Sequence, residues 1–173
     1  MLASVDTNEL QYALGGVVLE AGYLERALHA AFSALVGSKY AAVVAGNLME
    51  AVLIEDCQKI TKYHTDLSEA MKQALLSALK ACDEVRKTRN RIMHDAWATR
   101  PGGIMVTLQA NRDHEVTITA RTTNDIHQLA DELGRAADNL NAAMTAAFGI
   151  DWSHVEDQLR QELGHDISTD SGS

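Results

Sequence analysis

Apolar residues recur at steps of three and four through four long stretches of this chain, and no other sequence feature constrains its fold as much. The first stretch runs from about Thr7 to Leu35. Its regularly spaced apolar positions are Leu10, Leu14, Val17, Ala21, Leu24, Leu28, Ala31 and Leu35. This spacing predicts an amphipathic helix. Gly15, Gly16 and Gly22 lower its intrinsic helix propensity and are also typical of a close helix crossing.

Three further stretches predict helices of the same kind. The second helix covers about residues 39–62. Its apolar stripe consists of Val44, Leu48, Val52 and their neighbours. The third helix covers about residues 66–93, and the fourth covers about residues 124–148 and ends at Gly149.

An Arg-Pro-Gly-Gly break at residues 100–103 separates the third helix from two segments of alternating apolar residues. The segments cover residues 104–108 and 116–120, with residues 111–114 between them. Alternation with a period of two predicts β-strands, and the intervening residues predict a four-residue hairpin turn.

Together these elements predict a mainly α fold, an up-and-down bundle of four long helices with a β-hairpin inserted before the last long helix. A short C-terminal helix is expected at about residues 152–163. The chain has 173 residues, few aromatic side chains and a single proline, which suits one domain of close-packed helices. We assign residues 1–164 to this domain and residues 165–173 to a flexible tail.

The sequence gives no indication of a metal site, a cofactor or a membrane segment. Cys57 and Cys82 lie within apolar helical patterns, which fits buried, reduced thiols better than a disulfide framework or a zinc site. Residues 1–7 lack the pattern of a secretory signal, and no apolar run reaches membrane-spanning length. We therefore expect a cytoplasmic protein without a metal, a cofactor or a membrane partner.

The charge of the chain is unevenly distributed. The formal net charge is −9, which argues against general nucleic-acid binding through counterion release. Residues 80–100 nevertheless carry six Lys/Arg against three Asp/Glu, so this segment is about +3 and the remainder about −12. Either an anion binds near this segment, or it forms a solvated helix face with ordinary salt bridges.

The inward face of the third helix changes from apolar to polar over its last two turns. At 100° per residue, Leu75, Leu79 and Cys82 share one stripe. Arg86, Arg89 and Asn90 continue that stripe, whereas Lys80, Glu84, Lys87 and Arg91 lie on the opposite side. Local rules are broken in this way mostly at functional sites or interfaces, so the stripe is expected to open into a cleft or to meet another subunit.

Two structural explanations of the same stripe remain. Arg86 and Arg89 can pair with carboxylates such as Asp56 and lock the bundle, or they can stabilise helix C-termini. Asp56 lies among apolar residues of the second helix, so a partly buried carboxylate there would need a cationic partner. The other interpretation is that the second helix turns toward solvent near its end.

The segment Arg89-Asn90-Arg91-Ile92-Met93-His94 resembles the RNxxxH form of the Rx4–6H motif of the HEPN superfamily. The flanking Val85-Arg86 and Asp95 are also similar to that family's usual neighbourhood. The motif falls at the end of the third long helix, as in the HEPN bundle. The similarity is specific over about ten residues and covers the bundle loosely.

The resemblance implies a metal-independent endoribonuclease, often a toxin or defence component, that acts on RNA as a homodimer and is paired with a protein antitoxin. It assigns Arg89 and His94 as the catalytic pair and Asn90 as their polar support. Some family members carry a modified Tyr two residues after the His, but Ala96 occupies that position here.

The chemistry of RNA cleavage fits these residue types. Histidine can act as acid or base near neutral pH, and arginine stabilises the charge that develops on the phosphate. We assign Arg86, Lys87 and Arg91 to the RNA backbone and Asp56 to support of the catalytic groups. One His94 cannot easily serve as base and acid at once, whereas a twofold dimer supplies two. The alternative is a non-catalytic, dimeric HEPN-like module in which Arg89 and His94 bind a nucleotide or partner, or brace the fold.

Overall fold

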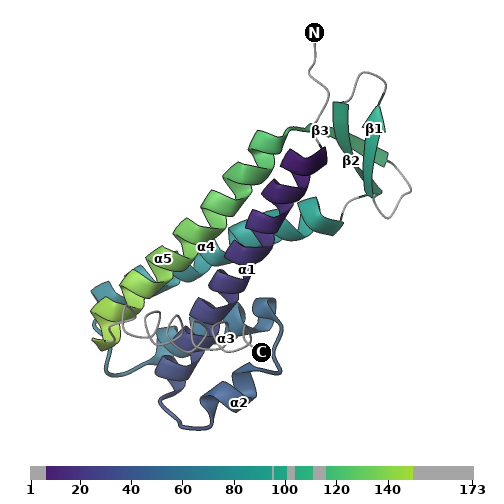
Figure 1. Ribbon diagram of the computed structural model, residues 1–173. Coiled ribbons are helices and arrows are strands. Elements are labelled where there is room, and N and C mark those ends of the chain that lie inside the picture. The colour runs from purple at the N-terminus through teal and green to yellow at the C-terminus, as the bar shows by residue number, and fades with distance from the viewer. Residues whose placement is uncertain (1–6, 95, 101–103, 111–115, 150–173) are drawn as a thin grey trace, which may run out of the picture.

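The computed structural model describes residues 7–94, 96–100, 104–110 and 116–149. These residues form a bundle of helices with a small antiparallel sheet at one end (Figure 1). The elements in chain order are α1 (Thr7–Val36), α2 (Ala41–Ala45), α3 (Glu50–Tyr63), α4 (Glu69–His94), β1 (Ala96–Arg100), β2 (Ile104–Ala110), β3 (Val116–Arg121) and α5 (Thr123–Phe148). Within the described ranges, none of the helices combines the length and the apolar character needed to cross a membrane.

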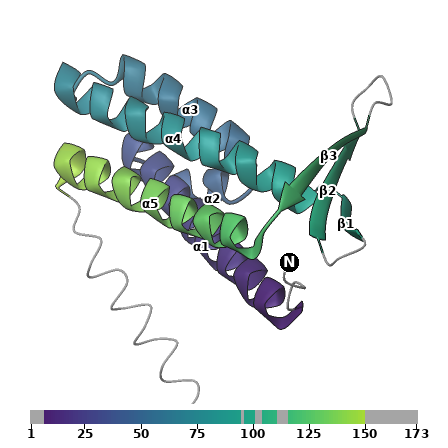
Figure 2. The same cartoon turned by 90° about the horizontal axis from the view of Figure 1, so that it is seen from above.

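The four longer helices pack in a closed ring, which confirms the predicted mainly helical bundle. Helix α1 packs against α5, α5 against α4, and α4 against α3 (Figure 2). Helix α3 also contacts α1, which closes the ring. The core consists of side chains from all four helices. Among the largest fully buried ones are Leu24, Leu28, Leu53, Leu75, Leu79, Leu129, Leu133, Leu140 and Met144.

Helices α1 and α5 make the longest contact in the bundle, and small residues permit their close approach. At Gly134 of α5, an added Cβ would lie 2.8 Å from Oε2 of Glu20 on α1. At Gly16 of α1, an added Cβ would lie 3.8 Å from the Cβ of Ala130. The predicted close crossing therefore exists at Gly16, whereas added Cβ atoms at Gly15 and Gly22 would meet nothing within 4 Å.

The second predicted helix, residues 39–62, is wrong as a single element because the chain breaks it into α2 and α3. Asn47 Nδ2 donates to the Val43 carbonyl oxygen at 3.0 Å, which satisfies a backbone acceptor where α2 ends. Met49 then adopts an extended conformation and precedes α3. The buried residues of α3 are Leu53, Ile54, Cys57 and Thr61, whereas Val44 of the predicted stripe is exposed.

The sheet has three strands in the order β1-β2-β3, with both pairs antiparallel. Strands β2 and β3 are the predicted hairpin, in which Val106 pairs with Ala120 and Leu108 with Ile118. Strand β1 was not predicted from the sequence, and its Ala98 pairs with Val106. The predicted turn residues 111–114, helix 152–163 and tail 165–173 lie outside the described residues.

Helix α5 starts and ends at clear capping signals. Thr122 and Asp125 form a reciprocal capping box, in which the Asp125 amide donates to Thr122 Oγ1 at 3.2 Å. Gly149 caps the other end with φ of 67°, the left-handed conformation that favours glycine, and this confirms the predicted terminator. Helix α5 therefore begins beside the sheet and runs along α1 away from it (Figure 1).

Candidate functional site

Arg89 lies on the last two turns of α4 and faces the first residue of α3. Its Nη2 atom donates a hydrogen bond to Oε2 of Glu50, and the two groups form an ion pair between α3 and α4. The side chains are 24% and 15% exposed, respectively. The cationic stripe predicted on the inward side of this helix therefore meets a carboxylate, as a partly buried guanidinium requires.

A hollow of about 470 Å³ opens beside this ion pair. Its walls come from α1, α3 and α4, and they combine apolar surface with three charged side chains. The lining residues are Val17, Val18, Ala21, Gly22, Glu25, Glu50, Arg89 and Met93. The Nε atom of Arg89 is buried and has no hydrogen-bond partner among the described residues. The guanidinium, which lines the hollow, thus includes a buried donor that no described acceptor satisfies.

The electrostatics of the hollow centre on Glu50. Burial raises the pKa of Glu50 above its ordinary value, and this effect exceeds the opposing attraction of Arg89. The charge of Glu25 raises the pKa of Glu50 further, whereas Arg86 lowers it. The carboxylate form of Glu50 is therefore costly here, although it has a cationic partner.

Arg86 and Lys87 are both paired with an acid on their own helix. Arg86 donates to Asp83 Oδ1 from Nη2 at 2.7 Å and from Nε at 3.2 Å, and Lys87 Nζ lies 2.5 Å from Asp83 Oδ2. Burial opposes ionisation of Asp83, but hydrogen bonds from Lys87 and Arg86 outweigh it and lower the pKa of Asp83. Arg86 is mostly buried and Lys87 is exposed, so only Lys87 presents its charge broadly to solvent.

Of the other motif residues, Asn90 and Arg91 do not line the hollow of Arg89. Asn90 is half-buried, and Arg91 is exposed with Nη2 3.5 Å from Thr88 Oγ1. His94 is the last residue of α4, which agrees with the predicted position of the motif at the helix end. The side chain of His94 lies outside the part of the chain that the structure describes. The structure therefore brings Arg89 to the hollow without placing the imidazole.

The structure corrects one expectation, the pairing of the cationic stripe with Asp56. Asp56 Oδ1 lies 3.7 Å from Nζ of Lys59 on its own helix, in a more exposed position than Glu50. Glu50 takes the role that was predicted for Asp56. A sequence signal for Glu50 existed, because it precedes the buried Leu53, Ile54 and Cys57 by three, four and seven residues.

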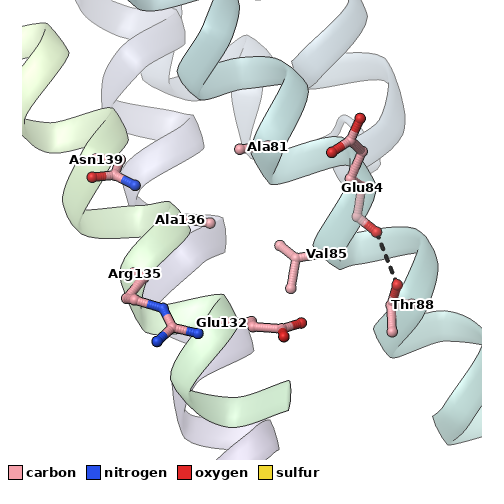
Figure 3. A pocket seen from close by; sticks show the side chains of 8 residues that line it. All are labelled: Ala81, Glu84, Val85, Thr88, Glu132, Arg135, Ala136 and Asn139. Atoms are coloured by element: carbon pink, nitrogen blue, oxygen red, sulfur yellow. Dashed lines mark hydrogen bonds between the residues drawn. The ribbon is translucent and has the colours of Figure 1, made fainter. Parts of the chain in front are cut away.

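A second hollow, of about 270 Å³, lies between α4 and α5 (Figure 3). Val85 projects between the two helices, and Glu84, Glu132 and Arg135 surround it. None of the predicted site residues whose side chains the structure describes lines this hollow. It lies on another face of α4 than Arg89, so it is separate from the candidate site.

The fold and the site define a helical-bundle protein with a paired arginine beside a hollow near the C-terminal end of α4. Comparisons with protein-family models, with curated proteins and with solved structures found no match to this chain. Within the described ranges, no group of three or more His, Cys, Asp or Glu side chains is arranged to hold a metal ion.

Proposed function

We propose that this chain is a metal-independent endoribonuclease of the HEPN type, with Arg89 stabilising the phosphate and His94 acting as acid or base. The observation that carries the proposal is the position of Arg89. The first residue of the motif lines a hollow of about 470 Å³, one helical turn before α4 ends at His94. A partly exposed guanidinium that lines such a hollow is suited to a phosphate oxygen.

The reaction follows from the chemistry of the two groups. A base removes the proton of the RNA 2′-hydroxyl, and the 2′-oxygen forms a bond to phosphorus. The bond from phosphorus to the 5′-oxygen breaks, and an acid protonates that leaving oxygen. Negative charge builds on the non-bridging oxygens meanwhile, where Arg89 stabilises it. Asn90, four residues before His94, supports the imidazole or a phosphate oxygen. The exposed Lys87 and Arg91 attract the RNA backbone, and Arg86 contributes positive charge from within.

A homodimer is part of the proposal, because one imidazole per chain supplies either the base or the acid. Helix α1 offers a surface for the second copy: Val18 and Leu19 are 60% and 74% exposed, and added Cβ atoms at Gly15 and Gly22 would meet open space. Val18 and Gly22 also line the hollow of Arg89. Antiparallel contact of two α1 helices about Val18 and Leu19 therefore places the two hollows on either side of the twofold axis.

Cysteine cross-linking tests this dimer. In the antiparallel contact, Gly15 of one copy faces Gly22 of the other, so a mixture of Gly15→Cys and Gly22→Cys chains should form a mixed disulfide. Each variant alone should cross-link poorly, since seven residues of helix separate the two positions by about 10 Å. Cys57 and Cys82 will not interfere, because both are buried. A monomer at all concentrations, or cross-linking of Gly15→Cys with itself, would contradict the arrangement.

The compartment and the partners follow from the same hypothesis. A ribonuclease toxin acts on cellular RNA, so we place the protein in the cytoplasm and expect a protein antitoxin that covers the site. Co-expression of such a partner should relieve the toxicity of the chain, as should His94→Ala.

Cleavage of RNA in the presence of a metal chelator tests the proposed activity. His94→Ala and Arg89→Ala should each abolish cleavage while the helical content is retained. Lys80→Ala is the matched control, because Lys80 is an exposed cation on the same helix and lies outside the hollow. It should cleave RNA as the unaltered chain does. Cleavage that persists in His94→Ala would exclude the proposed mechanism.

One observation favours the second candidate, a non-catalytic HEPN-like binding or structural module. The Arg89–Glu50 ion pair joins α3 to α4 and can brace the bundle. In that case no variant cleaves RNA at any concentration. Arg89→Ala lowers the free energy of unfolding under either candidate, because it leaves the mostly buried Glu50 carboxylate without its cation, so the cleavage assay decides between the two.

A further inference from the structure

We propose that Glu50 is an internal competitor for the anion site at Arg89, so that an external oxyanion binds the guanidinium only after Glu50 releases it. The inference deepens the proposed function, since the oxyanion it has in view is an RNA phosphodiester. It concerns the binding step alone, and can therefore be tested without any cleavage.

The hydrogen bonding of Arg89 shows that the site is only partly used. Glu50 accepts from Nη2, while the adjacent Nε is buried without a partner among the described residues. Nε and Nη2 lie on one edge of the guanidinium and together match two oxygens of a carboxylate or a phosphate. An oxyanion that takes both donors makes one hydrogen bond more than Glu50 does. Because Nε is buried in the present arrangement, an oxyanion in the hollow takes both donors only after the Glu50 carboxylate has moved away.

The charges around Glu50 explain why the two anions exclude each other. Arg89 and Arg86 of α4 and Glu25 of α1 are the charged groups that act on the Glu50 carboxylate. Arg86 is already bound to Asp83, so of the two arginines that act on Glu50 it is Arg89 that pairs with it. A further anion in this partly desolvated hollow would add like charge beside Glu50. Glu50 must therefore leave the guanidinium or take up a proton when the oxyanion enters.

The position of Glu50 in the chain makes its release feasible. It is the first residue of α3 and follows the break at residues 46–49, so it sits at a helix end rather than within a helix. Burial also favours the protonated acid, and its pKa is raised in consequence. Binding of an oxyanion should accordingly be accompanied by proton uptake, and the affinity should increase as the pH falls.

Titration of the full chain with inorganic sulfate at constant ionic strength tests the inference. Sulfate remains a dianion over the pH range used, and binding is followed by NMR shifts of the Arg89 side chain and of the neighbouring Met93 amide. Glu50→Gln keeps the size of the side chain and removes its charge. It should bind sulfate about tenfold more tightly at pH 7, the difference between a charged and a neutral hydrogen bond.

Glu55→Gln is the matched control, because it removes the same charge from an exposed position of the same helix, where Glu55 pairs with Lys59. It should leave the affinity unchanged, and Arg89→Ala should abolish saturable shifts at Met93. Equal or weaker sulfate binding by Glu50→Gln would overturn the inference, because Glu50 would then hold Arg89 in place for the anion. An equal gain in Glu55→Gln would also overturn it, by reducing the effect to net charge.

A second measurement keeps the inference testable if Glu50→Gln does not fold. In a His94→Ala background, which removes that imidazole, sulfate affinity should rise as the pH falls from 7 toward the raised pKa of Glu50, and a constant or falling affinity would contradict the competition. The RNA cleavage assay separates the two proposals. Tighter sulfate binding without cleavage in any variant supports the competitor and rejects the nuclease, whereas cleavage with unchanged binding does the reverse.

Discussion

Replacement of Gly22 by alanine is expected to stabilise the folded monomer. Gly22 lies in the middle of α1, where glycine costs roughly 0.5–1 kcal/mol relative to alanine, and an added Cβ would meet nothing within 4 Å. Nothing in the described part of the chain opposes this gain, so Gly22→Ala should raise the free energy of unfolding by about that amount. For a chain of this size the melting temperature should rise by about 1–4 °C.

Gly134→Ala is the matched comparison, because the same change on α5 meets a neighbour. Its Cβ would lie 2.8 Å from Oε2 and 3.4 Å from Cδ of Glu20, the far end of a flexible side chain. Glu20 can rotate away, but the loss of its position should reduce the gain below that of Gly22→Ala. Urea denaturation of both variants, followed by circular dichroism, measures the difference.

The same unfolding experiment tests the proposed dimer when it is repeated at several protein concentrations. If a second copy packs on α1, the gain of Gly22→Ala should appear in dilute solution and diminish, or change sign, as the concentration rises. A Gly22→Ala chain that is less stable than the unaltered chain in dilute solution would refute the reasoning, because the open space at this position would then be filled within one chain.

Three further predictions concern stability and reactivity. Burial raises the pKa of Glu50, so the folded chain binds a proton at this carboxylate more tightly than the unfolded chain does. The free energy of unfolding should therefore fall as the pH rises from the ordinary pKa of a glutamate through the raised one. Urea titrations of Glu50→Gln at several pH values should lack this pH dependence. Thr122→Ala removes the capping box of α5 and should cost about 1 kcal/mol in thermal unfolding. Burial raises the pKa of both Cys57 and Cys82 to about 12, so a thiol reagent should modify them rapidly only after denaturation, and fast labelling of the native chain would contradict their placement.

The helices that sequence periodicity predicted best are those whose buried positions keep the helical spacing without a break in the backbone. Helices α1, α4 and α5 lie within about three residues of their predicted bounds, although the inward face of α4 becomes polar near its end. The prediction of a single helix over residues 39–62 was wrong because its apolar pattern gives little sign of a break. Apolar residues continue through the break, and only Gly46 and Asn47 mark a stop that tertiary packing enforces.

The same break explains why the sequence pointed to Asp56, and not to Glu50, as a carboxylate partner for the cationic stripe. Asp56 continues the four-residue series of Val44, Leu48 and Val52, so a single uninterrupted helix places it on the apolar stripe. The break resets the helical phase, and α3 buries Leu53, Ile54 and Cys57 instead. Strand β1 was missed for another reason: its sequence, Ala-Trp-Ala-Thr-Arg, does not alternate apolar and polar residues, so only its pairing with β2 defines it as a strand.

The geometry of Arg89 bears on whether it braces the bundle or binds a ligand. A brace is most effective when it is fully enclosed and when every buried donor has an acceptor, because an unpaired buried donor costs free energy. Arg89 departs from both conditions: it is 24% exposed beside a hollow, and its buried Nε has no partner among the described residues. An oxyanion supplies the missing acceptor, whereas Glu50 in its present position does not. The unused donor therefore favours a ligand-binding arginine over one that only joins two helices, and it makes anion affinity the property of this site to measure first.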